Sequence, residues 1–340
     1  MAEKIGKQTY LLKSKPSICG YSAVVGKTEG EGPIAEDFDY IFSDDSINDS
    51  ASFEKAESAL QREAVTRAIA KANACTDDVD IIMGGDLLNQ CIGTTFGIKE
   101  MNIPFLGLYG ACSTMALSLG VGSTFVDSGA MKNAVVTTSS HFASAERQFR
   151  MPLEYGGQRT PTAQRTATAA GACYLSAHQK NAPSISAVIF GKIIDLDIKD
   201  PNNMGAAMAP AAADTIAQFL KDTGTQPSDY DLILTGDLGK VGKDLLIELL
   251  IKDENIDISS VHDDCGLIIY DMENQDVHAG GSGCGCSAAV LNSNIMKKMV
   301  SGELKKVLFV GTGALLSLTS NLQGESIPGI AHGVLITTEE

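Results

Sequence analysis

The stretch DIIMGGDL at residues 80–87 returns in the second half of the chain as DLILTGDL at residues 231–238. Each copy is a short apolar segment that ends in Gly-Asp-Leu. A second landmark recurs in the same order, because a Cys-Ser pair precedes a run of small residues at 112–113 and again at 286–287. Two unrelated landmarks in the same order indicate an internal duplication.

The segments around the first copy alternate between apolar runs and helical periodicity. Residues 52–73 place alanines and leucine at helical spacing, which predicts an amphipathic helix. The expected elements that follow are a strand at 80–84, a helix at 90–101, a strand at 104–109, a helix at 113–128 and a strand at 134–138.

The second half repeats this order with one insertion. Its first helix is predicted to begin with Pro210 near the first position and to end at Gly224. The inserted residues 262–281 indicate two strands around a polar turn. The remaining expected elements are a strand at 231–235, a helix at 241–252, a helix at 287–301 and a strand at 307–311.

Alternating strands and helices predict an α/β fold with parallel strand pairing and helices on the faces of the sheet. We expect two duplicated βαβαβ halves that are related by a pseudo-two-fold axis. The expected boundary gives an N-terminal half at 1–182 and a C-terminal half at 183–340.

Composition and charge narrow the class of protein. The chain has 340 residues, 44% of them hydrophobic, and a formal net charge of −16, which disfavours nonspecific nucleic-acid binding. No apolar run reaches the roughly 20 residues that cross a bilayer, and the start of the chain lacks the apolar core of a signal peptide. We therefore expect a cytoplasmic protein whose 8 cysteines are reduced thiols.

Cys112 follows an apolar run and precedes a helical one, so it lies at a strand-to-helix turn. Unpaired backbone N–H groups and the helix dipole favour a thiolate there, which predicts a nucleophile or an anion-binding corner. The alternative is a small buried residue chosen because the turn is crowded. The position alone does not decide between them.

Polar and basic residues follow another expected strand end. TTSSH at 137–141 places Ser140 and His141 where ligands bind in open α/β sheets. Arginines are concentrated just beyond, since the sequence has six and four of them are Arg147, Arg150, Arg159 and Arg165. Arginine grips carboxylates through two parallel hydrogen bonds, whereas the alternative role for each of these arginines is an ion pair with a nearby glutamate or a partner subunit.

Several motifs together carry a family resemblance that covers nearly the whole chain. The Gly-Ala-Cys-Ser turn at 110–113 and the glycine-rich AGGSGCGCSA at 279–288 resemble the thiolase and ketoacyl synthase superfamily. More narrowly, TSSHFASAERQFR, YDLILTGDL, HDDCGL and IAHGV resemble the stage V sporulation protein AD family. That resemblance implies a thiolase-like fold and a soluble member of the sporulation machinery that loads dipicolinic acid into spores.

The resemblance also implies that the catalytic machinery is lost. Condensing enzymes of the superfamily use histidine or asparagine from two loops of the second half. In this chain Asp237 stands where one histidine is expected, and Ser282 lies in the loop where the other residue is expected. Cys284 remains, but it lacks a histidine base. We therefore expect no catalytic residue, with Cys112 as a vestigial nucleophile.

The expected ligand is dipicolinic acid, a flat ring with two carboxylates, either free or as its neutral calcium chelate. No calcium-loop spacing is present, so we expect no dedicated protein metal site and no other cofactor. The residues expected to bind the ligand are Cys112, Ser113, Ser140, His141, Arg147, Arg150, Asp86, Asn89, Asp237, Ser282 and Cys284.

The expected partners are a second copy of the chain in a homodimer and membrane-embedded stage V sporulation proteins, which would hold it at the forespore or spore inner membrane. Two alternatives stay open. The chain is an active acyltransferase that uses Cys112 and a coenzyme A thioester, or it is an assembly scaffold with an empty vestigial pocket.

Overall fold

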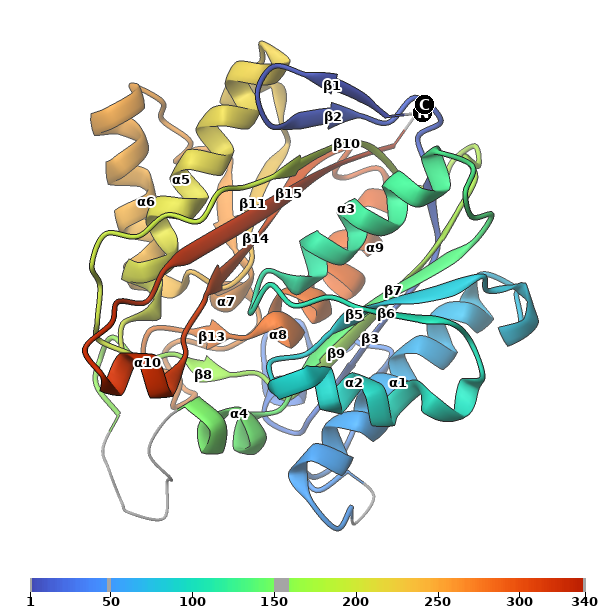
Figure 1. Ribbon diagram of the computed structural model, residues 1–340, viewed down its shortest axis with the longest axis horizontal. Helices are drawn as coiled ribbons and strands as arrows, with labels where there is room; N and C mark the ends of the chain where they lie inside the picture. Colours follow the sequence, from blue (N-terminus) through green and yellow to red (C-terminus); the bar gives the residue numbers. More distant parts are fainter. Residues whose placement is uncertain (1, 48–49, 150–158, 339–340) are drawn as a thin grey trace.

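Most strands of the described residues form one large mixed sheet with helices against its faces, and a separate two-stranded sheet lies beside it (Figure 1). The computed structural model describes residues 2–47, 50–149 and 159–338. The strands are β1 (Glu3–Ile5), β2 (Thr9–Leu11), β3 (Ser17–Val25), β4 (Tyr40–Ile41), β5 (Ile81–Gly85), β6 (Phe105–Gly107), β7 (Ala134–Ser140), β8 (Arg165–Thr166), β9 (Ala169–Ser176), β10 (Ser184–Phe190), β11 (Leu232–Thr235), β12 (His262–Asp264), β13 (Gly281–Ser282), β14 (Lys306–Ala314) and β15 (Gly329–Thr337).

Some helices cover the outer faces of the sheet, and others lie between the strands of its two halves (Figure 1). The helix α3 packs against strands of both halves, including β7 and β14, whereas α1 packs on β3 and β9, and α5 on β14 and β15. The helices are α1 (Phe53–Lys71), α2 (Ile92–Ile98), α3 (Thr114–Asp127), α4 (Phe142–Phe149), α5 (Met204–Thr223), α6 (Gly239–Glu254), α7 (Cys265–Ile268), α8 (Cys284–Val290), α9 (Met296–Ser301) and α10 (Leu318–Leu322).

The strand order shows the duplication directly. Along the main path the order is β12-β11-β14-β15-β10-β3-β9-β7-β5-β6. Outward from the centre, β3, β9, β7, β5 and β6 of one half correspond in turn to β10, β15, β14, β11 and β12 of the other. The predicted fold class is confirmed, because both halves repeat one strand order around the β10–β3 junction.

The predicted parallel pairing is confirmed for the strands that alternate with helices. Strand β5 pairs in parallel with β6 and β7, and β11 pairs in parallel with β12 and β14. The strands near the centre were not predicted, and they are antiparallel: β9 pairs with β3 and β7, and β15 with β10 and β14. The connections from β7 to β9 and from β14 to β15 contain the short helices Phe142–Phe149 and Leu318–Leu322, and in both cases the chain returns antiparallel to the strand before it.

The helix α1 shows how the apolar pattern of the sequence is used. Ser52 caps it by accepting a hydrogen bond from the backbone N–H of Lys55 at 3.3 Å. Leu60 and Ala68 of its apolar stripe are buried against the sheet. The backbone of β3 comes so close that a Cβ at Gly20 would lie 2.2 Å from the Ala68 carbonyl oxygen, so only glycine permits this packing.

The first helix of the second half was predicted to begin near Pro210, and this was wrong. The helix α5 begins at Met204 and contains Pro210, with Asn203 accepting a hydrogen bond from Ala206 N–H. Its first turn packs on α6 at close range, because a Cβ at Gly205 would lie 2.6 Å from the Leu238 carbonyl oxygen. Tertiary packing of this glycine therefore extends the helix beyond the expected proline start.

The predicted strand pair at 262–281 was also wrong. Only His262–Asp264 and Gly281–Ser282 are strands, and they pair with β11 and β8, not with each other. The Asp264 carboxylate accepts the Gly266 N–H at 3.0 Å and so caps α7 directly after β12. A helix therefore begins where the hairpin was expected to continue.

Candidate functional site

Cys112 lies on a tight turn between β6 and α3. The residue before it, Ala111, has a left-handed backbone with φ of +50°, which is strained for a residue with a Cβ atom. The turn packs on the second half of the chain, where a Cβ at Gly313 would lie 2.5 Å from the Gly110 carbonyl oxygen. Glycine in β14 therefore lets the Cys112 turn reach the centre of the molecule.

The Cys112 side chain meets a carboxylate from the other half. Asp237 follows β11 and is fully buried. Its carboxylate accepts the Thr312 hydroxyl at 2.8 Å and the Gly283 backbone N–H at 2.7 Å. The Cys112 thiol and the Ser282 hydroxyl lie beside it. The position where the family resemblance implied a histidine thus holds a carboxylate with a full set of donors.

This arrangement keeps the thiol protonated. Burial raises the pKa of the Cys112 thiol well above its ordinary value, and the negative charge of Asp237 raises it further. Burial also raises the pKa of the Asp237 carboxyl, against the effect of its donors. Burial and the carboxylate therefore act against the thiolate that the helix start was expected to favour.

Cys284 lies close by but is held by the backbone. Its Sγ donates to the Ser139 carbonyl oxygen at 3.0 Å, and burial raises the pKa of its thiol. It belongs to a small buried apolar cluster with Leu87, Cys112 and Ala145. Cys284 therefore acts as a packing residue behind Cys112.

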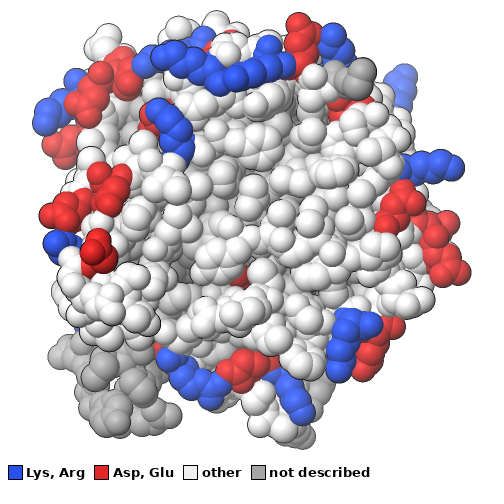
Figure 2. All heavy atoms as spheres, in the orientation of Figure 1, with Lys and Arg blue, Asp and Glu red and all other residues white. Residues whose placement is uncertain are grey.

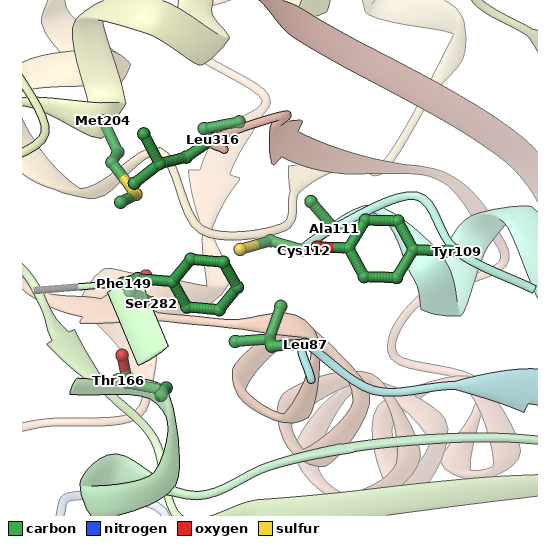
Figure 3. Close-up of a pocket in the computed structure, with 11 residues that line it drawn as sticks. Leu87, Tyr109, Ala111, Cys112, Phe149, Thr166, Met204, Ser282 and Leu316 are labelled. Atoms are coloured by element: carbon green, nitrogen blue, oxygen red, sulfur yellow. The ribbon is translucent and has the colours of Figure 1, made fainter. Parts of the chain in front are cut away.

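A narrow pocket opens above Cys112 (Figure 3). It encloses about 390 Å³ of empty space, open solvent at its mouth included. Figure 3 shows the Cys112 sulfur, the Phe149 ring and the Tyr109 hydroxyl turned toward a common space. Its lining comes from both halves and consists of Leu87, Tyr109, Ala111, Cys112, Ala145, Phe149, Thr166, Met204, Ser282, Ala314 and Leu316.

A wider and more polar hollow adjoins this pocket. It spans about 880 Å³ of empty space, open solvent included, and shares Tyr109, Phe149 and Leu316 with the pocket at Cys112. Asn89 and Gln148 bring amide groups to its wall, with Gln148 Nε2 donating to Asn89 Oδ1 at 3.3 Å. We call the part around Cys112 the throat and the outer part the vestibule. The site thus has a polar entrance and an apolar end.

Arg147 lies on a third hollow next to the vestibule. That hollow encloses about 650 Å³, and Asn89 and Gln148 line it together with Arg147 and Glu54. The Arg147 guanidinium forms an ion pair with the Glu54 carboxylate. Its charge is therefore near the entrance but already compensated. Arg150, the other predicted anion contact in this segment, lies outside the described residues.

The remaining arginines of the cluster do not converge on the pocket. Arg159 forms an ion pair with Asp276 at 2.7 Å, which leads it away from Cys112. Arg165 stacks on Phe142, with its guanidinium carbon 4.1 Å from the ring centre, and donates to the Thr28 hydroxyl at 3.3 Å. Arg159 thus forms an ion pair with an aspartate, whereas Arg165 makes a cation–π contact and a hydrogen bond.

Three predicted polar contacts instead hold the loops in place. The Ser113 hydroxyl donates to the Gly110 carbonyl oxygen at 2.6 Å. The Ser140 hydroxyl donates to the Ala167 carbonyl oxygen, also at 2.6 Å. The His141 Nε2 lies 2.7 Å from the Asp45 carbonyl oxygen, and its Nδ1 accepts the Ala143 N–H at 3.1 Å. None of Ser113, Ser140 and His141 lines the throat or the vestibule.

Asp86 also organises a loop. Its buried carboxylate accepts the Leu88 N–H at 2.8 Å, and the N–H and hydroxyl of Thr94 at 2.7 and 2.6 Å. These bonds hold residues 87–94, of which Leu87 lines the throat and Asn89 the vestibule. Asp86 therefore shapes the wall of the site from behind.

A second buried carboxyl group lies beside Asp86. Glu57 accepts the Ser139 hydroxyl at 3.1 Å and the Ser144 hydroxyl at 2.7 Å. Burial, together with the charge of Asp86, raises the pKa of Glu57 to about 8. A Cβ at Gly93 would lie 3.2 Å from the Asp86 carboxyl carbon and 3.3 Å from that of Glu57, so both acids flank this glycine.

Sequence patterns missed much of the pocket wall. Tyr109 directly precedes the Gly-Ala-Cys-Ser turn, so its place in the chain could have indicated a role. Phe149, Met204 and Leu316 come from separate elements and carry no local signal. No cluster of histidine, cysteine, aspartate and glutamate arranged to hold a metal ion occurs in the part of the chain that the structure describes.

Comparisons with known proteins assign the chain to a family. Residues 6–337 match the family model of stage V sporulation protein AD. The chain is 46% identical over 330 residues to "Stage V sporulation protein AD" of Bacillus subtilis (strain 168), covering 97% of this chain and 96% of that protein.

Solved structures share the fold at low identity. The 3-oxoacyl-[acyl-carrier-protein] synthase III from Aquifex aeolicus VF5 matches with a TM-score of 0.60 and 12% identity, over 95% of this chain and 99% of the other. Cerulenin-bound OleA from Xanthomonas campestris matches with a TM-score of 0.61 and 13% identity, over 96% and 97%. These two condensing-enzyme structures show that the fold is thiolase-like.

Proposed function

Because the chain belongs to the stage V sporulation protein AD family, we propose that it is a non-catalytic component of the sporulation machinery that binds dipicolinic acid, free or as its calcium chelate, for uptake into the developing spore. The observation that carries the non-catalytic part is the buried Asp237 carboxylate beside the Cys112 thiol, at the position where a histidine was expected. The same bound ligand would be released when the spore germinates.

The Cys112–Asp237 pair argues against acyl transfer. A nucleophilic cysteine needs a depressed pKa or an adjacent base, and Asp237 raises the pKa of this thiol instead. None of the described residues that line the throat is a histidine. Attack on a thioester would therefore start from a neutral, buried thiol.

The shape of the site supports a flat aromatic ligand. Tyr109 and Phe149 are shared by the throat and the vestibule, so a ring placed at their junction meets two aromatic side chains. Offset or edge-to-face packing of such rings is favourable. The amides of Asn89 and Gln148 lie on the vestibule side, where the carboxylates of the ligand would point.

Charge favours the calcium chelate over the free dianion. No lysine or arginine occurs among the described residues that line the throat and the vestibule, and Asp237 lies beneath Cys112. A dianion would gain little there, whereas the chelate is neutral and brings its own Ca²⁺. Amide oxygens suit the oxygen preference of that ion.

Calorimetric titration with dipicolinate, with and without calcium, tests this proposal. Wild type should bind, Cys112→Ala should bind with a modest loss, and Cys112→Trp should block the throat. Cys75→Trp is the matched control, because Cys75 is exposed and remote from the pocket lining. If Cys112→Trp binds dipicolinate normally, the ligand binds elsewhere. If wild type does not bind it, the binding proposal is wrong and the assembly scaffold is the remaining alternative.

An active condensing enzyme is the second candidate. The strained Ala111 at the Cys112 turn favours it, since strain collects at functional sites. The check is mass spectrometry after incubation with acetyl and longer acyl coenzyme A esters. We expect no acylated Cys112. Stoichiometric acylation with turnover would replace the binding proposal.

We further propose that the chain forms a homodimer through the edge of β6. This strand ends the sheet, and Phe105 and Leu106 on it are each 37% exposed, whereas the equivalent edge strand β12 is partly buried. An open apolar edge is a ready template for pairing with a second copy. The face in view in Figure 2, over α3, carries its charges mainly at the periphery.

Membrane-embedded stage V sporulation proteins are the other proposed partners, and they would hold the chain at the forespore inner membrane. None of the described helices is long and apolar enough to span a bilayer. Attachment would therefore depend on protein contacts made at the surface of the chain.

A further inference from the structure

A groove remote from Cys112 lies where α5 and α6 pack side by side, at the left of Figure 1. It spans about 600 Å³ of empty space, open solvent at its mouth included. Its apolar lining comes from the segment after β10 and from the two helices, and consists of Ile194, Leu196, Pro210, Ala213 and Leu249. Its acidic lining consists of Asp214, Asp253 and Glu254.

Large apolar side chains are exposed in and beside this groove. Leu196 is 59% exposed, and Ile193 next to it in the same segment is 62% exposed. Ile251 on α6 is 47% exposed. Single exposed apolar residues are common, but their concentration around an apolar hollow with a polar rim is typical of a protein-binding surface.

The acidic side of the groove has unused capacity for a cation. Lys192 Nζ bonds to Asp214 Oδ1 at 2.8 Å, but the buried Oδ2 of the same carboxylate has no hydrogen-bond partner among the described residues. Lys221 pairs with Glu254 at 2.5 Å. Three carboxylates thus face two lysines, and one carboxylate oxygen is unpaired.

We propose that this groove is the docking site for a short basic and apolar segment of a membrane-embedded partner, with a leucine- or isoleucine-sized side chain on its floor and a lysine or arginine at Asp214 Oδ2. Cytoplasmic loops of membrane proteins are rich in lysine and arginine, which complements the acidic rim. The membrane partner, but not the basic and apolar character of the segment, rests on the proposed function.

The same charges exclude two other occupants. Anionic lipid headgroups would be repelled by Asp214, Asp253 and Glu254, and the net charge of −16 adds to that repulsion. A second copy of the chain would have to bring a basic patch to this groove from a strongly acidic protein. A protein segment with apolar and basic side chains would complement both the apolar floor and the acidic rim of the groove.

Fluorescence anisotropy with the full chain tests the docking site. The probe is a short amphipathic peptide of leucine, alanine and arginine, and its twin carries glutamate in place of arginine. The basic probe should bind and the acidic twin should not. Asp214→Asn should weaken binding about tenfold, because a charge-assisted hydrogen bond is lost, and Leu196→Ser should weaken it comparably.

Asp229→Asn is the matched control, since Asp229 does not line the groove. Dipicolinate titration of the same variants separates the two proposals, because the groove variants should keep wild-type ligand binding. An array of cytoplasmic-loop peptides from the membrane-embedded partners should then show binding that Asp214→Asn weakens. No binding of the basic probe, wild-type affinity in both groove variants, or preferred binding to phosphatidylglycerol vesicles would each overturn the docking site.

Discussion

The Cys112 thiol lies beside the buried Asp237 carboxylate, across the junction of the two halves of the chain. A condensing enzyme needs a base at this place that takes a proton from sulfur. The carboxylate here is itself occupied by Thr312 and Gly283, and it stabilises the protonated thiol. The proposed loss of catalysis therefore rests on a carboxylate that opposes ionisation of the thiol within a thiolase-like fold.

Asp237→Asn should make Cys112 more reactive. The amide keeps the size of the carboxylate but removes the negative charge that raises the pKa of the thiol. A fall of one pKa unit is a tenfold rise in the thiolate fraction, so alkylation should become about tenfold faster at mildly alkaline pH. The measurement is the pH–rate profile of iodoacetamide labelling, followed by mass spectrometry of the Cys112 peptide. Asp263→Asn is the control. A pH–rate profile that Asp237→Asn leaves unchanged would contradict the effect of Asp237 on the Cys112 thiol.

Arg147 and Glu54 should affect ligand binding in opposite directions. Arg147→Ala removes a cation from the hollow next to the vestibule and, because Glu54 already compensates this charge, should weaken binding of free dipicolinate only about twofold to threefold, whereas lysine should rescue poorly. Glu54→Gln frees Arg147 from its ion pair and should strengthen binding. Calorimetry of the variants without calcium is the measurement, with Arg67→Ala as control. Wild-type affinity in both variants would make the pair purely structural.

Glu57 should make the chain less stable as the pH rises. Its pKa in the folded protein is about 8 against an ordinary value of 4.5. The stability that protonated Glu57 contributes to the fold is therefore fully present below pH 4.5 and is lost as the pH rises through 8. The slope is about 1.4 kcal/mol per pH unit for one such group. The buried His262 and His332, with pKa values of about 4, destabilise only below pH 6.5.

The test of this dependence is Glu57→Gln. Burial also raises the pKa of Glu29 and Asp264 to about 7, so Glu57 dominates between pH 7 and 8. Denaturant unfolding should show a loss of stability from pH 6.5 to 8 that is about 1–2 kcal/mol smaller in the variant than in wild type. Glu63→Gln, a partly exposed change on the same helix, should keep the wild-type slope. Equal slopes in all three proteins would refute the raised pKa.

Leu106→Lys should dissociate the proposed homodimer. The change puts a charge on the open edge of β6, where an unpaired lysine blocks pairing of strands from two copies. Sedimentation velocity should show a monomer for this variant and a dimer for wild type. Val300→Lys serves as control, because Val300 is 56% exposed on α9. Either a monomeric wild-type protein or a dimeric Leu106→Lys variant would show that β6 is not the dimer interface.

The local sequence pattern was sufficient to predict the strands and helices that alternate along the chain. The repeated Gly-Asp-Leu strand ends predicted β5 and β11 within one residue, and the small-residue run after Cys112 predicted α3. These segments were predictable because periodicity and capping depend on residues close in sequence. The start of α5 was not, since the contact of Gly205 with Leu238 outweighed the usual preference for proline at a helix start.

The sequence by itself determined the duplication, the thiolase-like α/β fold and the place of Cys112 at a strand-to-helix turn. Only the tertiary structure decided that Asp237 lies beside the thiol, that Ser140 and His141 support loops, and that Arg147 is paired with Glu54. The physical reason is that burial and charge pairing set the chemistry of a side chain, and both depend on residues that are distant in the chain and meet only when the two halves pack.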